Sequence, residues 1–84
     1  MRGIVLQLNK AVSYRLIQLL NERNMTAYRL FTQTGISKSA ISKIINCQQK
    51  SVNLTTLHVF CQGLDITLEE FFHSDLFSNE NLDP

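Results

Sequence analysis

Residues 35–46, GISKSAISKIIN, set short hydroxyl and long ammonium side chains into an isoleucine-rich stretch. If this stretch is helical, residues three and four positions apart are neighbours, so Lys38 lies beside Ser42 and Ser39 beside Lys43. The isoleucines then fall on the opposite side. A lysine can donate to guanine O6 and N7 or to a phosphate, and a serine can donate or accept at either type of base pair. The polar side of this helix therefore suits the major groove of DNA.

The same pattern would otherwise be typical of a solvated helix surface, so the neighbouring elements decide its meaning. The capping and apolar pattern predicts two short helices, at about 27–33 and about 38–46. They are joined by a turn of about four residues containing Gly35, because glycine can adopt the left-handed conformation that ends a helix. Two helices joined in this way form a helix-turn-helix unit, whose second helix enters the major groove.

Four helix starts share one local pattern, in which a capping residue has an apolar residue just before it and another four positions after it. In such a start, the cap oxygen accepts from a free helix N–H while the apolar pair closes over the turn. The four are Thr26 with Met25 and Leu30, Ser37 with Ile36 and Ile41, Asn53 with Val52 and Leu57, and Thr67 with Ile66 and Phe71. The last also has Glu70 in position for a capping box. Together these starts predict an all-α chain.

Five helices are expected in total. Apolar residues at helical spacing place the start of the first helix between residues 4 and 10 and its end near Asn24. The fourth helix should cover about 54–64, with Leu54 on its inner side, and the fifth about 68–73. We therefore expect two parts: a helix-turn-helix domain over residues 1–73 and an acidic C-terminal tail over residues 74–84.

The composition of the 84-residue chain fits one small domain that is 44% apolar. No apolar run is long enough to span a membrane, and the first residues lack a signal-peptide pattern. Two cysteines are too few for a disulfide framework, so we expect reduced thiols and a cytoplasmic protein. Residues 1–64 carry eight basic and one acidic side chain, a charge of +7, whereas residues 65–84 carry −6. This asymmetry favours a body that faces a polyanion.

Zinc binding and catalysis are less favoured. His58 and Cys61 lie one turn apart, and Cys47 and His73 could add ligands, but Cys61 lies on an apolar stripe and no C-x-x-C pair occurs. Neither histidine has an evident nucleophile or carboxylate partner, and no glycine-rich phosphate loop is present. We therefore expect no metal site, no cofactor and no enzymatic activity.

Residues 12–72 resemble the phage-repressor (Cro-like, XRE) helix-turn-helix family in the segments RNMTAYRL, GISKSAISKI and LTTLHVFCQGLDITLEEFF. The resemblance implies a compact five-helix, lambda-repressor-like domain formed around a helix-turn-helix of helices two and three. It places the base-reading positions at Lys38, Ser39, Ser42 and Lys43. It places the phosphate-contacting positions at Thr26, Ala27, Tyr28, Asn46, Gln48 and Lys50.

Several positions depart from the family pattern. A glutamine that often follows the cap of the second helix, and braces the reading residues, is Ala27 here. The next residue, Tyr28, could reach a phosphate or cover the helix pair. Phe31 replaces a small residue on the buried side of the second helix, so we expect altered local packing.

Two further departures concern the third helix. Cys47 stands where the family has a glycine after this helix. Leu20 and Ile45 replace a buried Arg–Glu pair between the first and third helices. Exchanging a buried ion pair for packed apolar residues is often neutral or stabilising, and both halves change together here.

The resemblance implies a transcriptional regulator of prokaryotic or phage origin, most often a repressor. It would bind double-stranded DNA as a homodimer on a two-fold-related site. An alternative is a helix-turn-helix scaffold that acts as a protein-interaction module, an adaptor or antitoxin-like partner, through its acidic end EEFFHSDLF. Phe71 and Phe72 are expected to close the core, although one of two adjacent aromatic residues could remain exposed and seed a dimer.

Overall fold

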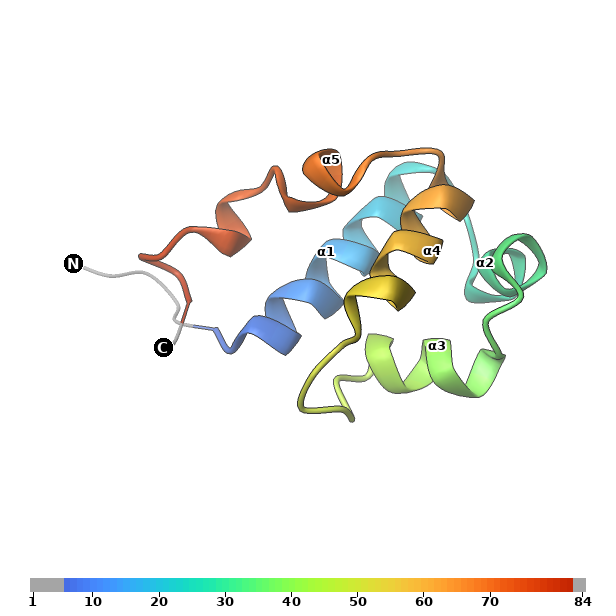
Figure 1. Ribbon diagram of the computed structural model, residues 1–84, viewed down its shortest axis with the longest axis horizontal. Coiled ribbons are helices and arrows are strands. Elements are labelled where there is room, and N and C mark those ends of the chain that lie inside the picture. The colour runs from blue at the N-terminus through green and yellow to red at the C-terminus, as the bar shows by residue number, and fades with distance from the viewer. Residues whose placement is uncertain (1–5, 83–84) are drawn as a thin grey trace.

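The computed structural model describes residues 6–82, which form five α-helices followed by a short 3₁₀-helix (Figure 1). These elements are α1 (Leu8–Glu22), α2 (Ala27–Thr34), α3 (Lys38–Ile45), α4 (Leu54–Leu64), α5 (Leu68–Phe72) and η1 (Asp75–Phe77). The expected helix ranges agree with these bounds to within about two residues, the usual uncertainty of a helix end. The all-α fold class is confirmed, and no helix within the described residues is long and apolar enough to cross a membrane.

Each of the four expected capping residues begins a helix. Their side-chain oxygens accept from a backbone N–H two or three positions ahead, and Thr67 and Glu70 complete the capping box. The apolar residues just before the caps are packed against the core; these are Met25, Ile36, Val52 and Ile66. By contrast, α1 follows Gln7 without a side-chain cap bond, in keeping with the less distinct start of this helix in the sequence.

The core is built mainly from α1 and α4, and α2, α3 and α5 each add one or two side chains. Its buried apolar residues include Val12, Leu16, Leu19, Leu20, Leu30, Ile41, Ile44, Leu57, Phe60, Cys61, Leu64 and Phe71. Leu54 departs from the expectation, because it is 68% exposed. As the first residue of α4, it lies before the part of the helix that other elements cover.

Gly63 allows α2 and α4 to approach closely. A Cβ atom built on Gly63 would lie 2.5 Å from Cγ2 of Thr34. Thr34 is held in place, because its hydroxyl donates to Leu30 O at 2.7 Å and accepts from Ile36 N at 3.1 Å. The close approach therefore seats the turn between α2 and α3 directly on α4.

Residues 74–82, assigned to the acidic tail in the sequence, lie against the helical body. η1 contacts α1, and the Phe77 ring lies 4.9 Å from Phe72 and 6.1 Å from Phe71, centroid to centroid. Further along, Asn81 O accepts from Leu6 N at 2.7 Å. Leu6 and Leu82 form an isolated parallel bridge that joins the two ends of the described chain.

Candidate nucleic-acid interface

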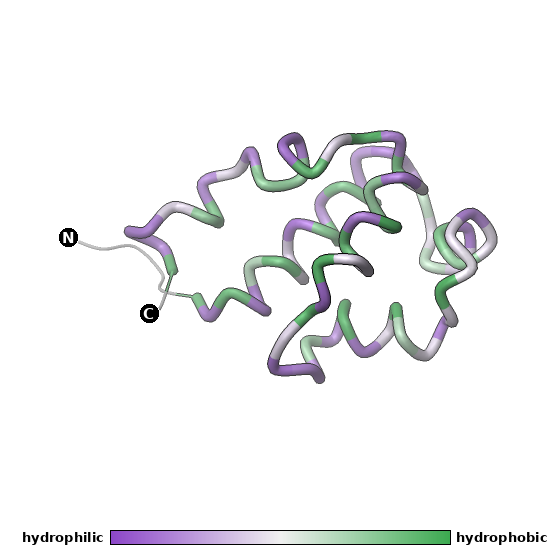
Figure 2. Tube along the Cα trace, in the orientation of Figure 1, coloured by the Kyte–Doolittle hydropathy of each residue, from purple (hydrophilic) through white to green (hydrophobic). Residues whose placement is uncertain are grey.

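The third helix lies along one edge of the molecule, while α5 lies along the opposite edge with α1 and α4 between them (Figure 1). Ile41 and Ile44 are buried and Ile45 is partly buried, as the isoleucine spacing predicts. Figure 2 shows hydrophobic residues of α3 on the side toward the body and hydrophilic residues on the other. The four expected base-reading residues are all exposed; we call Lys38, Ser39, Ser42 and Lys43 the recognition face.

The turn before α3 fixes the direction of the recognition face. Gly35 ends α2 in the left-handed conformation, with φ 75°, and its N–H donates to Phe31 O at 2.8 Å. No atom lies within 4 Å of a Cβ built on Gly35, so the position needs glycine for its backbone angle and not for space. Ser37 then caps α3 by accepting from Ala40 N at 3.1 Å.

Ser42 in α3 and Asn46, the C-cap residue of α3, share a hydrogen bond that decides whether the Ser42 hydroxyl donates or accepts toward solvent. Asn46 Nδ2 donates to Ser42 Oγ at 3.0 Å. A hydroxyl that accepts this bond keeps its proton for an outward bond. Ser42 is thus prepared as a donor, which suits the acceptors N7 and O6 of guanine, N7 of adenine and O4 of thymine.

The residues expected to contact phosphate flank α3 on two sides. Thr26 is exposed but uses its hydroxyl oxygen to accept from Arg29 N at 3.1 Å. The Ala27 side chain packs against the core, which leaves its backbone N–H in the first turn of α2 as its means of contact. Tyr28 is exposed at the same end of α2. After α3, Gln48 and Lys50 are exposed, and Asn46 is exposed while bonded to Ser42.

Two polar residues of α1, not identified from the sequence, position this region. Ser13 is only 2% exposed, and its hydroxyl donates to Ile45 O at 2.6 Å, at the end of α3. One turn earlier, Asn9 Nδ2 donates to Gln49 O at 2.7 Å in the loop that follows. The signal for Ser13 was its place three residues before Leu16, on the buried side of the helix, where a polar group needs a partner.

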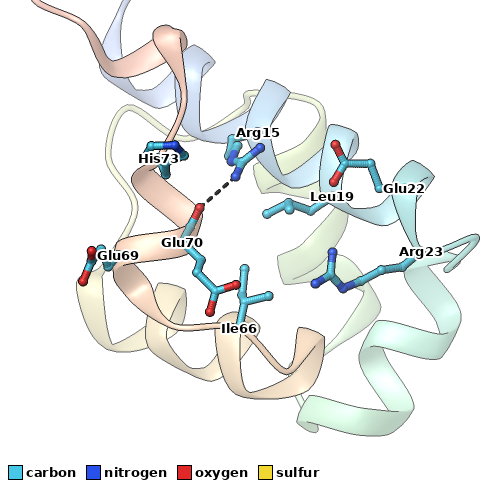
Figure 3. Close-up of a pocket in the computed structure, with 8 residues that line it drawn as sticks. All are labelled: Arg15, Leu19, Glu22, Arg23, Ile66, Glu69, Glu70 and His73. Atoms are coloured by element: carbon cyan, nitrogen blue, oxygen red, sulfur yellow. Dashed lines mark hydrogen bonds between the residues drawn. The ribbon is translucent and has the colours of Figure 1, made fainter.

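Arg15 of α1 and Arg23, the C-cap residue of α1, both donate to helix ends on the α5 side of the molecule. Arg15 donates from Nε to Phe71 O at 2.6 Å. It also donates from Nη2 to Glu70 O at 2.8 Å (Figure 3). Arg23 donates from Nε to Leu64 O at 3.1 Å, near the end of α4. Cations are favourable at helix C-termini, where carbonyl groups lack helical partners. Both arginines therefore act as caps in a hollow they share with Glu22, Glu69 and Glu70.

The remaining basic and acidic residues lie on different sides of the molecule. No acidic residue occurs between Glu22 and Asp65. The basic residues of that stretch that are exposed on α2, α3 and the following loop are Arg29, Lys38, Lys43 and Lys50. Of the described acids, all but Glu22 follow α4 in the chain, on or beside α5 and η1. This distribution gives the recognition face a uniformly positive surround.

The two cysteines are distinguished by backbone conformation in one case and by burial in the other. Cys47 follows α3 with φ 57°, a left-handed angle that favours glycine, which matches the family's residue at this place. Cys61 is fully buried; its burial, and to a smaller extent the charge of Glu70, raise the pKa of its thiol. Within residues 6–82, no group of three or more His, Cys, Asp or Glu residues is placed to hold a metal ion.

Comparisons with known proteins agree with this geometry. Two solved structures superpose on the chain with a TM-score of 0.73 each. One is the restriction-modification controller protein C.Esp1396I, solved as a tetramer with its natural 35 base-pair operator; it is 23% identical, over 77% of this chain and 84% of that one. The other is the prophage Lp1 protein 11, 26% identical over 96% of this chain and 97% of that one. No curated protein sequence matches the chain.

The family comparison covers the whole helix-turn-helix and most of its supporting helices. Residues 15–74 match the model of the Cro/C1-type helix-turn-helix DNA-binding domain. This range is well over half of the 84 residues and includes α2, α3, α4 and α5. The resemblance expected from the sequence is confirmed: the protein belongs to the Cro/C1-type helix-turn-helix DNA-binding family.

Proposed function

We propose that the protein is a sequence-specific transcriptional regulator, of repressor type, that reads the major groove of double-stranded DNA with α3. The observation that carries this proposal is the exposed recognition face, held outward by the buried isoleucines of the same helix. Lys38 and Ser39 open α3, where the first turn of a recognition helix meets base edges. Ser42 and Lys43 follow one turn later, with Ser42 prepared as a donor.

Phosphate contacts on both sides of α3 would set its register in the groove. The first turn of α2, with Thr26, Ala27 and Tyr28, offers free N–H groups and a phenol to one phosphate. Asn46, Gln48 and Lys50 would meet another. Such contacts fix orientation and supply affinity on every sequence, whereas base contacts supply the preference for one.

A homodimer on a two-fold-related site is the proposed binding unit. The recognition helix has eight residues and reads only a few base pairs, so one copy offers limited specificity. Two copies on half-sites about 34 Å apart, one turn of DNA, would double the sequence read. The controller protein with the same fold, which was solved as a tetramer on its operator, supports an oligomeric unit.

Selection of bound sites from random duplex DNA tests this function most directly. We expect a two-fold-related consensus whose half-site spacing reports the dimer. Lys38→Ala and Ser39→Ala should blur the preference at individual positions. Lys50→Ala should weaken binding to all sequences about equally and reduce the salt slope by about 1. If no duplex, random or genomic, is bound at low salt, the proposed function is wrong.

A further inference from the structure

Lys38, the first residue of α3, lies over two aromatic rings of α2. Its Nζ is 4.7 Å from the centroid of the Tyr28 ring and 5.8 Å from that of Phe31. Both distances fall within the range of about 6 Å over which the negative face of a ring attracts a cation. Within residues 6–82, Lys43 has no ring beneath its ammonium. The two lysines of the recognition face are therefore held differently.

Phe31 anchors this pair of rings to the body of the protein. Tyr28 and Phe31 are three positions apart on α2, hence neighbours on its surface, with ring centroids 6.1 Å apart and planes at 59°. Phe31 packs against the buried core, whereas Tyr28 is 60% exposed. Phe31 thus supports the Tyr28 ring, and the two rings together support the Lys38 ammonium.

We propose that Tyr28 and Phe31 are positioning residues for base recognition, forming an aromatic seat that holds the Lys38 ammonium at the α2 end of the recognition face. This inference rests on the proposed function, because it gives a cause for the specificity of that surface. A lysine has a flexible four-carbon stem and could otherwise reach several phosphates. Holding its ammonium before DNA arrives lowers the ordering cost of one chosen contact.

The seat also selects the chemistry of the base that Lys38 reads. A ring face attracts one side of the ammonium, and its three N–H donors leave at least one free to point outward. Guanine presents two adjacent acceptors, O6 and N7, in the major groove, whereas adenine presents one acceptor beside a donor. We therefore expect a guanine opposite Lys38, because guanine offers two adjacent acceptors to the outward donors of the ammonium.

The matched variants Tyr28→Phe and Tyr28→Leu separate the ring from the hydroxyl. The position read by Lys38 is first located as the one whose preference disappears in Lys38→Ala. Tyr28→Leu should then reduce discrimination for guanine at that position by about two- to fivefold, the factor expected of an exposed cation–π contact. Other positions should be unchanged, and Tyr28→Phe, which keeps the ring, should retain full discrimination at the Lys38 position. Phe31→Leu, which keeps an apolar group at the core, should show a loss at the same position.

A second measurement needs no DNA and so separates the seat from the proposed function. Protons held above a ring face shift upfield in NMR spectra. The Hε protons of Lys38 should be shifted in the free protein and in Tyr28→Phe. In Tyr28→Leu, where only the Phe31 ring remains, they should move toward ordinary values. The exposure of Tyr28 makes both variants compatible with folding. If no duplex is bound but these shifts are found, the function fails and the seat remains.

Three results would overturn the seat. The first is a Lys38 side chain with no upfield shift in the free protein. The second is a Tyr28→Phe variant that loses discrimination at the Lys38 position, which would assign the effect to the Tyr28 hydroxyl and not to its ring. The third is a Tyr28→Leu variant that keeps full discrimination at the Lys38 position.

Discussion

The side of the molecule that carries α2 and α3 and the side that carries α5 use basic residues for different tasks. On the α2–α3 side, Lys43 and Lys50 are exposed in a stretch without acids. On the α5 side, Arg15 and Arg23 donate to main-chain carbonyls among glutamates. Two of the eight basic residues are thus helix caps. A count of basic side chains therefore overstates how many are free to contact a polyanion, because Arg15 and Arg23 are already hydrogen-bonded to main-chain carbonyls.

The largest effect should come from removing a cap on the α5 side. Arg15→Met loses the bonds to the carbonyls of Phe71 and Glu70, so the free energy of unfolding should fall by about 2 kcal/mol. Affinity for DNA, measured on the folded protein, should change little. Denaturant titration and a binding isotherm at the same temperature check the two parts.

Lys50→Met is the matched control from the α2–α3 side. Its stability should stay within about 0.5 kcal/mol of the unaltered protein, because the residue is exposed. Its affinity should fall on every sequence, with a salt slope lower by about 1. An exchange of outcomes between Arg15→Met and Lys50→Met would contradict the division of tasks.

A smaller effect is expected at Gly63, where α4 meets the turn of the α2–α3 side. Gly63→Ala places a methyl group against Thr34. Overpacking should outweigh the better helix propensity of alanine and cost about 1–2 kcal/mol. DNA binding should weaken as well, because the turn must move. Gln62→Ala, exposed on the same helix, should lack both effects; a fully stable Gly63→Ala would show that α2 and α4 are not in close contact.

Ser13→Ala tests whether a buried bond to the end of α3 affects the discrimination between bases. It removes the bond to Ile45 O and should cost about 1 kcal/mol. Because Ile45 ends α3, discrimination between bases should also decline. Ser74→Ala removes a bond that Ser74 Oγ accepts from Leu76 N at 3.2 Å on the α5 side, and it should leave discrimination intact. If the two variants discriminate equally well between bases, Ser13 does not position α3.

The smallest effect concerns the thiols. Burial raises the pKa of Cys61 above its ordinary value of 9.0. The unfolded chain therefore loses this proton first, so the associated stability is complete below about pH 9 and declines as the pH rises through the folded pKa. Cys61→Val should flatten this alkaline decline, whereas Cys47→Ala should not. Unfolding measured from pH 7 to 10 gives the comparison, and equal declines in all three proteins would contradict it.

Local signals allowed most of the helical architecture to be predicted. Thr26, Ser37, Asn53 and Thr67 act within three residues of themselves, so their roles can be found in a short window of sequence. Gly35 likewise ends α2 by its own backbone angle. The inner side of α3 follows from the spacing of its isoleucines. The exposure of the recognition face could be predicted because the caps and the isoleucine spacing together determine which side of α3 faces away from the core.

The parts that were not predicted depend on partners distant in sequence. Ser13 meets Ile45 O across 32 residues, and Arg15 meets Phe71 O across 56. No spacing rule links such pairs. The seat under Lys38 needed the angle between α2 and α3, which the sequence indicates only as a turn.

The bridge between Leu6 and Leu82 brings both ends of the described chain to one place. That place is one end of the 42 Å long axis, and α2 lies toward the other (Figure 1). A fluorescent protein or a second DNA reader fused at either end would start from the same point. Its linker length, and not the choice of terminus, would decide how far it reaches along the duplex.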